Sequence, residues 1–333
     1  MSAIKTTYSS AFTQLLRCIK PVLTMMATLG ILAFLLLSVP AMAGGVKTIV
    51  DSSGQARPVA KPFTRIISLY SAHTENLCSL GAEKQLIGIS LSDDYPPAIT
   101  GRPRFSYRED PEKFIALQPD LVLVRPMIER SYPQFIDKLK QAGIAVISLQ
   151  PNSVKEMFGY WHSLGILTGR EAQAQEMITV FQTRLKVVQD GLKNVPDDQR
   201  PKVYFQSIHK KMKTFAPESI GTFVLKEAGG INIAADAEQV RATNIAVFGK
   251  EQLLSRGPEI DIFLAQHGRM NPVDIDTILK EPGFAAIKAV REGQVFLIEE
   301  ALVSRPTLRI LNGIEQLNAL FYRRHDKNLQ SSL

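Results

Sequence analysis

Glu112-Lys-Phe-Ile-Ala-Leu-Gln-Pro119-Asp120-Leu-Val-Leu-Val124 and Glu251-Gln-Leu-Leu-Ser-Arg-Gly-Pro258-Glu259-Ile-Asp-Ile-Phe263 are two distant stretches that share one pattern. In each, an acid begins a short helix, and a proline seven residues later precedes a β-rich run. A helix that leads into a buried strand is a unit of α/β folds. Its recurrence therefore predicts two similar α/β lobes.

A second repeated unit supports this division. Leu139–Leu149 and Ile287–Ile298 both read as a helix, a glycine stop and a strand, with Gly143 and Gly293 as the stops. We expect residues 46–150 to form the first lobe and residues 200–325 the second. Further strands of the first lobe are expected at Arg65–Leu69, Leu86–Ser90, Leu121–Val124 and Ala145–Leu149.

The segment between the lobes, residues 151–195, has helical periodicity. Met177, Val180, Phe181 and Leu185 follow three-and-four spacing, and Pro196 ends the pattern. The prediction is one long amphipathic helix. The expected fold class is thus α/β, with two Rossmann-like lobes joined by a single long helix and a ligand cleft between them. A single connecting helix would limit hinge motion.

Residues 1–43 have the organisation of a secretory signal peptide. Arg17 and Lys20 precede an uncharged run from Pro21 to Pro40, and Ala41-Met42-Ala43 provides a small-x-small end. We expect cleavage after Ala43 and a periplasmic protein. The alternative is an uncleaved anchor, since 18 uncharged residues are near the lower limit for crossing a bilayer. No cysteine follows the apolar run, so a lipid-anchored start is not supported.

Composition excludes several classes of protein. The 333 residues are 45% hydrophobic and 21% charged, an ordinary globular balance. The net charge of +7 includes three cations of residues 1–43, and the remaining charge forms no basic run that would follow a nucleic acid. Cleavage would leave Cys78 as the only cysteine, which we expect to be a small buried apolar residue. The five histidines form no cluster, and no hydrolase, nucleotide-binding or metalloprotease motif is present.

Candidate ligand residues lie in loops that follow strands, where open α/β sheets bind ligands. Aromatic rings together with arginines suit a bulky, partly planar, anionic ligand. The candidates are Tyr70, Ser71, Asp93, Phe105, Tyr107 and Arg125 in the first lobe, and His209, Met212, Arg241, His267, Arg269 and Arg305 in the second.

Two acids occupy matching places near helix starts, Glu75 in the first lobe and Glu218 in the second. An acid there interacts favourably with the helix dipole, which alone explains one such residue. Two at equivalent positions predict a pair of contacts to a partner that carries arginines.

Together these segments resemble the periplasmic binding proteins of ABC importers for iron-siderophores, haem and cobalamin. The resemblance covers residues 46 to about 323 and is carried by Arg65-Ile-Ile-Ser-Leu-Tyr-Ser-Ala-His-Thr-Glu75, Leu80-Gly-Ala, Leu86-Ile-Gly-Ile, Asp94-Tyr-Pro-Pro97, Leu117-Gln-Pro-Asp-Leu-Val-Leu and Ser304-Arg-Pro-Thr-Leu-Arg309. It implies two lobes with the ligand in the cleft and small closure motions. It also implies that Glu75 and Glu218 meet arginine pockets of an inner-membrane permease.

The expected function is capture of a metal chelate by a monomer that has no resident cofactor or metal and no catalytic activity. An iron-siderophore is the first choice because several arginines suit an anionic complex. Cobalamin is second. Haem is third, since Tyr70, Tyr107, His209 or His267 would have to supply an axial bond. Two other classes stay open: an exported enzyme using Asp93 and His209 as acid and base, and a receptor for a free metal ion.

Overall fold

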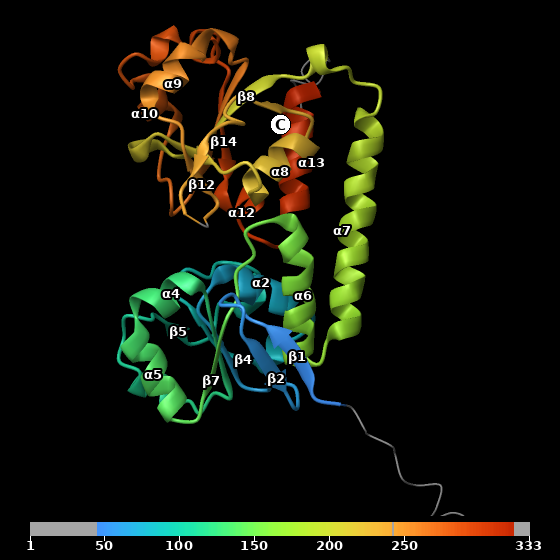
Figure 1. Cartoon of the computed structure of the whole chain (residues 1–333), viewed down its shortest axis with the longest axis vertical. Helices are drawn as coiled ribbons and strands as arrows, with labels where there is room; N and C mark the ends of the chain where they lie inside the picture. Colours follow the sequence, from blue (N-terminus) through green and yellow to red (C-terminus); the bar gives the residue numbers. More distant parts are fainter. Residues whose placement is uncertain (1–44, 242, 323–333) are drawn as a thin grey trace, which may run out of the picture. The chain divides into compact units, whose positions relative to one another are not determined.

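The computed structural model describes residues 45–241 and 243–322. The predicted signal peptide, its cleavage site and residues 323–325 lie outside the described residues. Figure 1 shows two α/β lobes, with α7 (Glu171–Leu192) running beside both of them.

The first lobe is built on a five-stranded parallel sheet in the order β5-β4-β3-β6-β7. All four strands expected here are present: β4 and β6 have the predicted bounds, β3 is one residue shorter at each end, and β7 is one residue shorter at its carboxyl end. β3 and β6 lie inside the sheet, and both are buried along their whole length. The strands are β3 (Ile66–Ser68), β4 (Leu86–Ser90), β5 (Arg104–Phe105), β6 (Leu121–Val124) and β7 (Ala145–Ser148), beside a separate antiparallel hairpin of β1 (Lys47–Val50) and β2 (Ala56–Val59).

Short helices connect these strands. They are α2 (Ser71–Ser79), α3 (Glu112–Ile115), α4 (Pro126–Ser131) and α5 (Pro133–Gln141), with 3-10 turns at Glu83–Gln85 and Pro97–Ile99. Gly143 after α5 has φ 79° and Gly293 in the second lobe has φ 66°, so both occupy the left-handed region that a helix stop requires. The two predicted helix-glycine-strand units are therefore confirmed.

The second lobe has a mixed seven-stranded sheet. Its strands β8, β13 and β14 are parallel, while β9, β12 and β11 add an antiparallel extension and β10 pairs with the start of β8. The strands are β8 (Lys202–Ile208), β9 (Lys213–Phe215), β10 (Ile231–Asn232), β11 (Glu238–Gln239), β12 (Ile245–Val247), β13 (Ile262–His267) and β14 (Val295–Glu299). The helices are α8 (Ile220–Glu227), α9 (Lys250–Ser255), α10 (Ile275–Leu279), α11 (Lys288–Arg291), α12 (Glu300–Val303) and α13 (Ile310–Tyr322), with 3-10 turns at Asp197–Gln199, His209–Lys211, Gly257–Glu259 and Phe284–Ala286.

The prediction of one continuous helix over residues 151–195 is wrong. The chain forms α6 (Val154–Thr168), turns at Gly169, and returns as α7 against α6. Gly169 has φ 69°, and the side chain of Pro62 lies where its Cβ would stand. The periodicity continues through the break because both helices bury an apolar face. α7 contacts α8 and α13 of the second lobe as well as α6 of the first.

A continuous hydrophobic core extends from the first lobe through α6 and α7 into the second. It contains Leu121 of β6, Phe181 of α7 and Phe205 of β8, and a smaller core completes each lobe. Trp161 of α6 is fully buried, and its Nε1 donates a 3.0 Å hydrogen bond to the carbonyl of Pro306. Asn76 of α2 donates to the same oxygen at 2.9 Å. The two lobes are therefore held together by a common apolar core and by the hydrogen bonds that Trp161 and Asn76 donate to the carbonyl oxygen of Pro306.

Two smaller expectations concern Cys78 and membrane helices. Cys78 is half-buried against the large core, and burial raises the pKa of its thiol to about 12, which suits an inert apolar role. In residues 45–241 and 243–322, no helix is both long and apolar enough to cross a bilayer.

Candidate ligand-binding cleft

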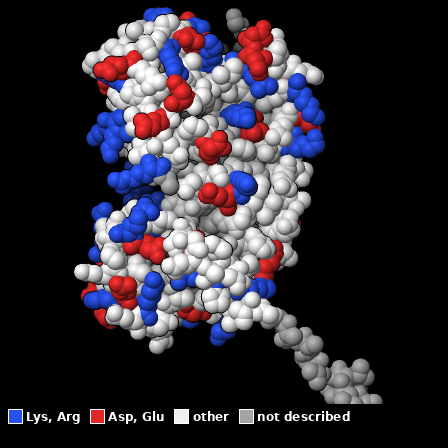
Figure 2. Space-filling model, in the orientation of Figure 1, with Lys and Arg blue, Asp and Glu red and all other residues white. Residues whose placement is uncertain are grey.

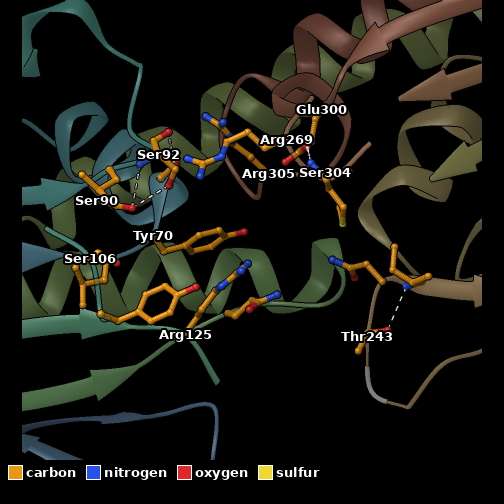
Figure 3. A pocket seen from close by; sticks show the side chains of 18 of the residues that line it. Tyr70, Ser90, Ser92, Ser106, Arg125, Thr243, Arg269, Glu300, Ser304 and Arg305 are labelled. Atoms are coloured by element: carbon orange, nitrogen blue, oxygen red, sulfur yellow. Dashed lines mark hydrogen bonds between the residues drawn. The ribbon is translucent and has the colours of Figure 1, made fainter. Parts of the chain in front are cut away.

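A cavity of about 620 Å³ lies where the loops of the two lobes face each other. Figure 3 shows side chains from both lobes that point into it. Its walls on the first lobe come from the carboxyl ends of β3, β4, β5, β6 and β7, where ligands of parallel sheets bind. Its lining residues are Leu69–Ser71, Ser90–Ser92, Phe105–Arg108, Arg125, Gln150, Phe215, Thr243–Ile245, Arg269, Met270, Glu300, Ser304 and Arg305.

Tyr70 and Arg125 mark the centre of the first-lobe wall. Tyr70 follows β3 and Arg125 follows β6, and these two neighbouring strands are where the strand order reverses. The guanidinium carbon of Arg125 lies 5.2 Å from the Tyr70 ring centre, a cation–π contact. Burial raises the pKa of the Tyr70 hydroxyl, so this group stays a neutral donor. Within the described residues Arg125 has no acidic partner, and its charge is free to meet a ligand.

Tyr107, Arg108 and Phe105 form the adjoining wall. Tyr107 packs on Tyr132 with ring centres 4.8 Å apart, and the Arg108 guanidinium carbon lies 5.7 Å from the Tyr107 ring. Phe105 lies flat against the sheet because Gly88 has no side chain: a Cβ there would be 2.6 Å from the Phe105 ring. The aromatic surface predicted for this loop is thus held in place by packing.

The second-lobe wall combines one acid with Arg269 and Arg305. Glu300 accepts a 2.8 Å hydrogen bond from the backbone N–H of Met270, which holds the loop that carries Arg269. Ser304 is fixed by a 2.5 Å hydrogen bond to the Gln266 side chain. Arg269 has no acidic partner among the residues described, so it resembles Arg125 in presenting an uncompensated charge.

Arg305 differs because it is already paired. Its Nη1 lies 2.7 Å from Oε1 of Glu75 and 3.1 Å from Oδ1 of Asp94, both in the first lobe. Arg309 approaches Glu75 at 3.6 Å, and its guanidinium covers the Tyr95 ring at 4.5 Å. Arg305 therefore lines the cavity and also connects the lobes.

Glu75 is not positioned as the sequence analysis expected of a permease contact. The residue is 3% exposed, and its side chain faces Arg305 rather than solvent. Burial raises its pKa, while Arg305 and Arg309 act in the opposite direction. Glu75 lies in the second turn of α2, one turn beyond the helix start, and the sequence pattern does not reveal that the second lobe covers this turn. Glu218 is exposed, as expected.

Asp93 does not line the cavity either. Its carboxylate accepts hydrogen bonds from the Thr74 hydroxyl at 2.5 Å and from the Ser90 N–H at 3.1 Å, and it is 2% exposed. Burial raises its pKa. Ser71, correctly placed at the cavity, bonds the carbonyl of Ser92 at 3.1 Å. Asp93 thus orders the loop that presents these serines.

Four second-lobe candidates lie away from the cavity lining. His209 is 5% exposed, with Nδ1 3.0 Å from the Gln206 side chain and Nε2 3.5 Å from Glu281; burial lowers its pKa. The ring of His267 bonds the carbonyl of Val273 at 2.7 Å. The other two are Met212 and Arg241, which take left-handed backbone angles with φ 46° and 52°.

These four residues were predicted to lie at one edge of the sheet because they follow strands. The chain reverses at His209, where β8 turns back into β9, and the His209 ring therefore points into the second lobe. In the described parts of the chain, no three His, Cys, Asp or Glu side chains come together as a metal site.

The sequence analysis missed several lining residues. Gln150 lies two residues after β7 and Glu300 directly follows β14, so the rule that found Tyr70 and Arg125 would have found them had it been applied to every strand. Phe215 and Thr243–Ile245 come from the antiparallel extension, for which the sequence offered no signal.

The charge of the cavity lining is positive. Four arginines and one glutamate line it, and Arg305 alone among those arginines has a salt bridge in the described structure. Figure 2 shows Lys and Arg side chains bordering the molecule at the level where the lobes meet. A cavity with arginines over aromatic rings recognises a large ligand with delocalised or anionic groups.

Comparison with known proteins agrees with this architecture. A model of the periplasmic binding protein family matches residues 66–302. The chain is 28% identical over 263 residues to the vitamin B12-binding protein of Vibrio cholerae, covering 78% of this chain and 90% of that protein. It is 26% identical over 278 residues to an uncharacterized ABC transporter substrate-binding lipoprotein of Bacillus subtilis, covering 83% and 85%.

Solved structures share the fold. A possible iron-binding periplasmic protein from Staphylococcus epidermidis aligns with a TM-score of 0.67 and 27% identity, over 79% of this chain and all of that one. A periplasmic haem-binding protein from Pseudomonas aeruginosa aligns with a TM-score of 0.66 and 20% identity, over 79% and 94%. With the family model covering most of the sequence and the cleft lying between two α/β lobes, the chain belongs to the periplasmic binding protein family.

Proposed function

We propose that this protein captures an anionic metal chelate in the cleft between its lobes and delivers it to an ABC permease. The observation that carries the proposal is the lining itself: Arg108, Arg125 and Arg269 have no acidic partner among the described residues and lie with Tyr70 and Tyr107 around one cavity. Uncompensated guanidinium groups over rings favour a large anionic complex and disfavour a bare cation.

A ferric siderophore is the first candidate because its catecholate or hydroxycarboxylate complexes carry several negative charges. A corrinoid is the second, and it is supported by the relatives named as vitamin B12-binding proteins. Haem is third. Of the proposed axial groups, Tyr70 and Tyr107 line the cavity, whereas His209 and His267 do not.

The relatives support a partner and a location for this chain. The Bacillus subtilis relative is named an ABC transporter substrate-binding lipoprotein and the matching family is that of periplasmic binding proteins, which supports a permease partner and a small-molecule ligand. We also propose that residues 1–43 direct export and that the protein is a monomer in the periplasm.

Contact with a permease requires exposed acids, and Glu75 is buried. A second pair of acids at matching positions is exposed. Glu112 is the first residue of α3 and Glu251 the second residue of α9, at equivalent points of the repeated sequence pattern. Both are exposed, and neither has an ion-pair partner within the described residues. We infer that Glu112 and Glu251 meet basic groups of the permease, one from each lobe.

An enzyme that uses Asp93 and His209 is disfavoured. Asp93 orders a first-lobe loop and His209 is enclosed by second-lobe residues, and neither side chain lines the cavity. A general acid and base must reach one substrate. A free-metal receptor lacks support for a different reason, since arginines would repel the ion.

The test is a parallel binding titration. Protein beginning at Gly44 is titrated with ferric enterobactin, ferrioxamine B, haem and cyanocobalamin by calorimetry, and bound ligand is then extracted and checked by mass spectrometry. Saturation at one ligand per chain by ferric enterobactin, haem or cyanocobalamin, which all carry anionic groups, supports the proposal if the ligand is recovered unchanged. Ferrioxamine B is the contrasting probe because its ferric complex is a cation, and we expect it to bind more weakly. Absence of binding to all four by folded protein, or chemical conversion of the ligand, contradicts it.

A further inference from the structure

A second cavity, of about 780 Å³, adjoins the first on the first-lobe side. Its walls are the β1–β2 turn, the start of α4, the segment after β7 and one face of α6. Arg125, Gln150 and Thr243 line both cavities, so the two spaces meet at these residues. The face of α6 contributes Glu156, Gly159, Tyr160 and Ser163, which follow helical spacing along one side of the helix.

The second cavity has the chemistry of a site for an amphipathic chain. Val50, Met127 and Pro151 supply apolar surface, and Val50 remains 61% exposed although it is apolar. Arg125 and Arg130 supply cations that have no acidic partner in the described structure.

The two acids of this cavity already have partners. Asp51 is neutralised by Arg57, whose Nε lies 2.7 Å from it. Glu156 accepts the N–H of Asn152 at 2.8 Å. The backbone N–H leaves the charge of Glu156 in place, but Arg125 and Arg130 outnumber this acid, so the net charge available to a ligand is positive here also.

Gly159 keeps this space open. It lies in the interior of α6, where glycine is unfavourable because of its backbone entropy, and a Cβ built on it meets no atom within 4 Å. Packing against neighbours therefore does not require a glycine at this position. A side chain there would project into the second cavity.

From these observations we propose that the ligand has two parts: a ring-bearing or metal-bearing body in the first cavity, and an arm in the second whose anionic group lies between Arg125 and Arg130. This inference rests on the proposed function and narrows it. A compact planar chelate would fill only the first cavity. A chelate with an extended anionic side chain would use both, and Arg125 would contact it where body and arm join.

The experiment fills the second cavity from Gly159. Variants Gly159→Ala, Gly159→Leu and Gly159→Phe are titrated with whichever of ferric enterobactin, ferrioxamine B, haem and cyanocobalamin the wild-type protein binds. We expect affinity near wild type for Ala and a loss of tenfold or more for Phe, with Leu between them. Gly191→Phe in α7 is the matched control, since Gly191 also has free space around it but lines neither cavity.

A second variant tests the arm's charge. Arg130→Gln should weaken the same ligand several-fold, and added salt should reduce that difference. Circular dichroism and melting temperature establish that each variant is folded. If Gly159→Phe and Arg130→Gln bind like wild type while Arg125→Ala binds weakly, the ligand occupies one cavity and this inference is wrong. If the wild type binds none of the four probes, the proposed function fails first and the inference with it.

Discussion

Arg305 joins the lobes through Glu75, with 2.7 Å between Nη1 and Oε1, and the same guanidinium lines the ligand cavity. The pair is largely buried, with side-chain exposures of 12% for Arg305 and 2% for Glu75. An anionic ligand and Glu75 therefore compete for one cation. Oε2 of Glu75 has no hydrogen-bond partner in the described structure, so the carboxylate depends on this contact.

The first prediction is a double-mutant cycle on this pair. Arg305→Ala should destabilise the protein by about 3 kcal/mol, because it leaves a buried carboxylate without its main partner. Glu75→Gln with Arg305→Ala should cost less than the two single changes added together. Urea unfolding at neutral pH measures the free energy of unfolding of the wild type, the two single variants and the double variant. Additive effects would mean that the ion pair has no net coupling.

The second prediction concerns the unpaired arginines of the cavity. Arg125→Ala and Arg269→Ala should each weaken an anionic chelate by about 1–3 kcal/mol, the range for a hydrogen bond to a charged group. Calorimetric titration at two salt concentrations measures the loss. Arg291→Ala, in α11 and away from the cavity, is the control and should leave affinity unchanged. Wild-type affinity in both cavity variants would remove these arginines from the site.

The third prediction tests permease contact. Glu112→Lys combined with Glu251→Lys should leave chelate affinity intact and strongly reduce uptake of labelled chelate by cells that depend on this protein. Glu218→Lys provides the comparison, since Glu218 is the exposed member of the pair first expected from the sequence. Normal uptake by the double variant, with loss in Glu218→Lys, would return the docking role to Glu218.

The fourth prediction is acid sensitivity caused by His73. Its ring lies 2.7 Å from the Tyr160 hydroxyl and 3.0 Å from the carbonyl of Val124, and burial lowers its pKa to about 4. The unfolded chain binds a proton below about pH 6.5, whereas the folded chain does so only near pH 4. The stabilisation is complete above pH 6.5, and about 3 kcal/mol is lost between pH 6.5 and 4.

Urea unfolding across this pH range measures the effect. His73→Gln, which keeps polar atoms but does not titrate, should show a smaller decline in stability on acidification. A decline of equal size in both proteins would assign the acid sensitivity to other groups.

The fifth prediction concerns the turn between α6 and α7. Gly169→Ala should destabilise the protein by about 1–3 kcal/mol, because φ is 69° and Pro62 occupies the position of the new Cβ. Gly159→Ala should instead stabilise it by about 0.5–1 kcal/mol, because alanine suits an open helix interior. Thermal unfolding of the two variants, measured side by side, should move in opposite directions.

The repeated pattern predicted the lobes well because buried strands are recognisable over four or five residues. Leu86–Ser90 and Leu121–Val124 are confirmed to the residue. The break at Gly169 was missed because hydrophobic periodicity reports which face is buried and is insensitive to a reversal of direction between two such faces. Gly165, whose Cβ would lie 2.9 Å from the Cβ of Ala174, indicates how closely the two helices pack there.

The site was predicted less completely, for a geometric reason. Tyr70, Tyr107, Arg125 and Arg269 reach the cavity because each lies one or two residues after a strand of its lobe. Phe105 is the last residue of β5, and Arg305 follows the short helix α12. His209 follows a strand too, but the chain reverses there and the ring is drawn toward Glu281. A sequence pattern also does not reveal contacts between distant segments: Glu75 is buried by a segment 230 residues away, which carries Arg305.

The shared core has a consequence for how the molecule melts and how it can be divided. Leu121, Phe181 and Phe205 belong to one cluster, so neither lobe can lose its packing without exposing apolar surface of the other. Calorimetry should therefore record a single endotherm, although the sequence repeats like two domains. A fragment ending near residue 150 would present the surface that normally covers α6 and would aggregate, so the repeated halves are no longer independent folding units.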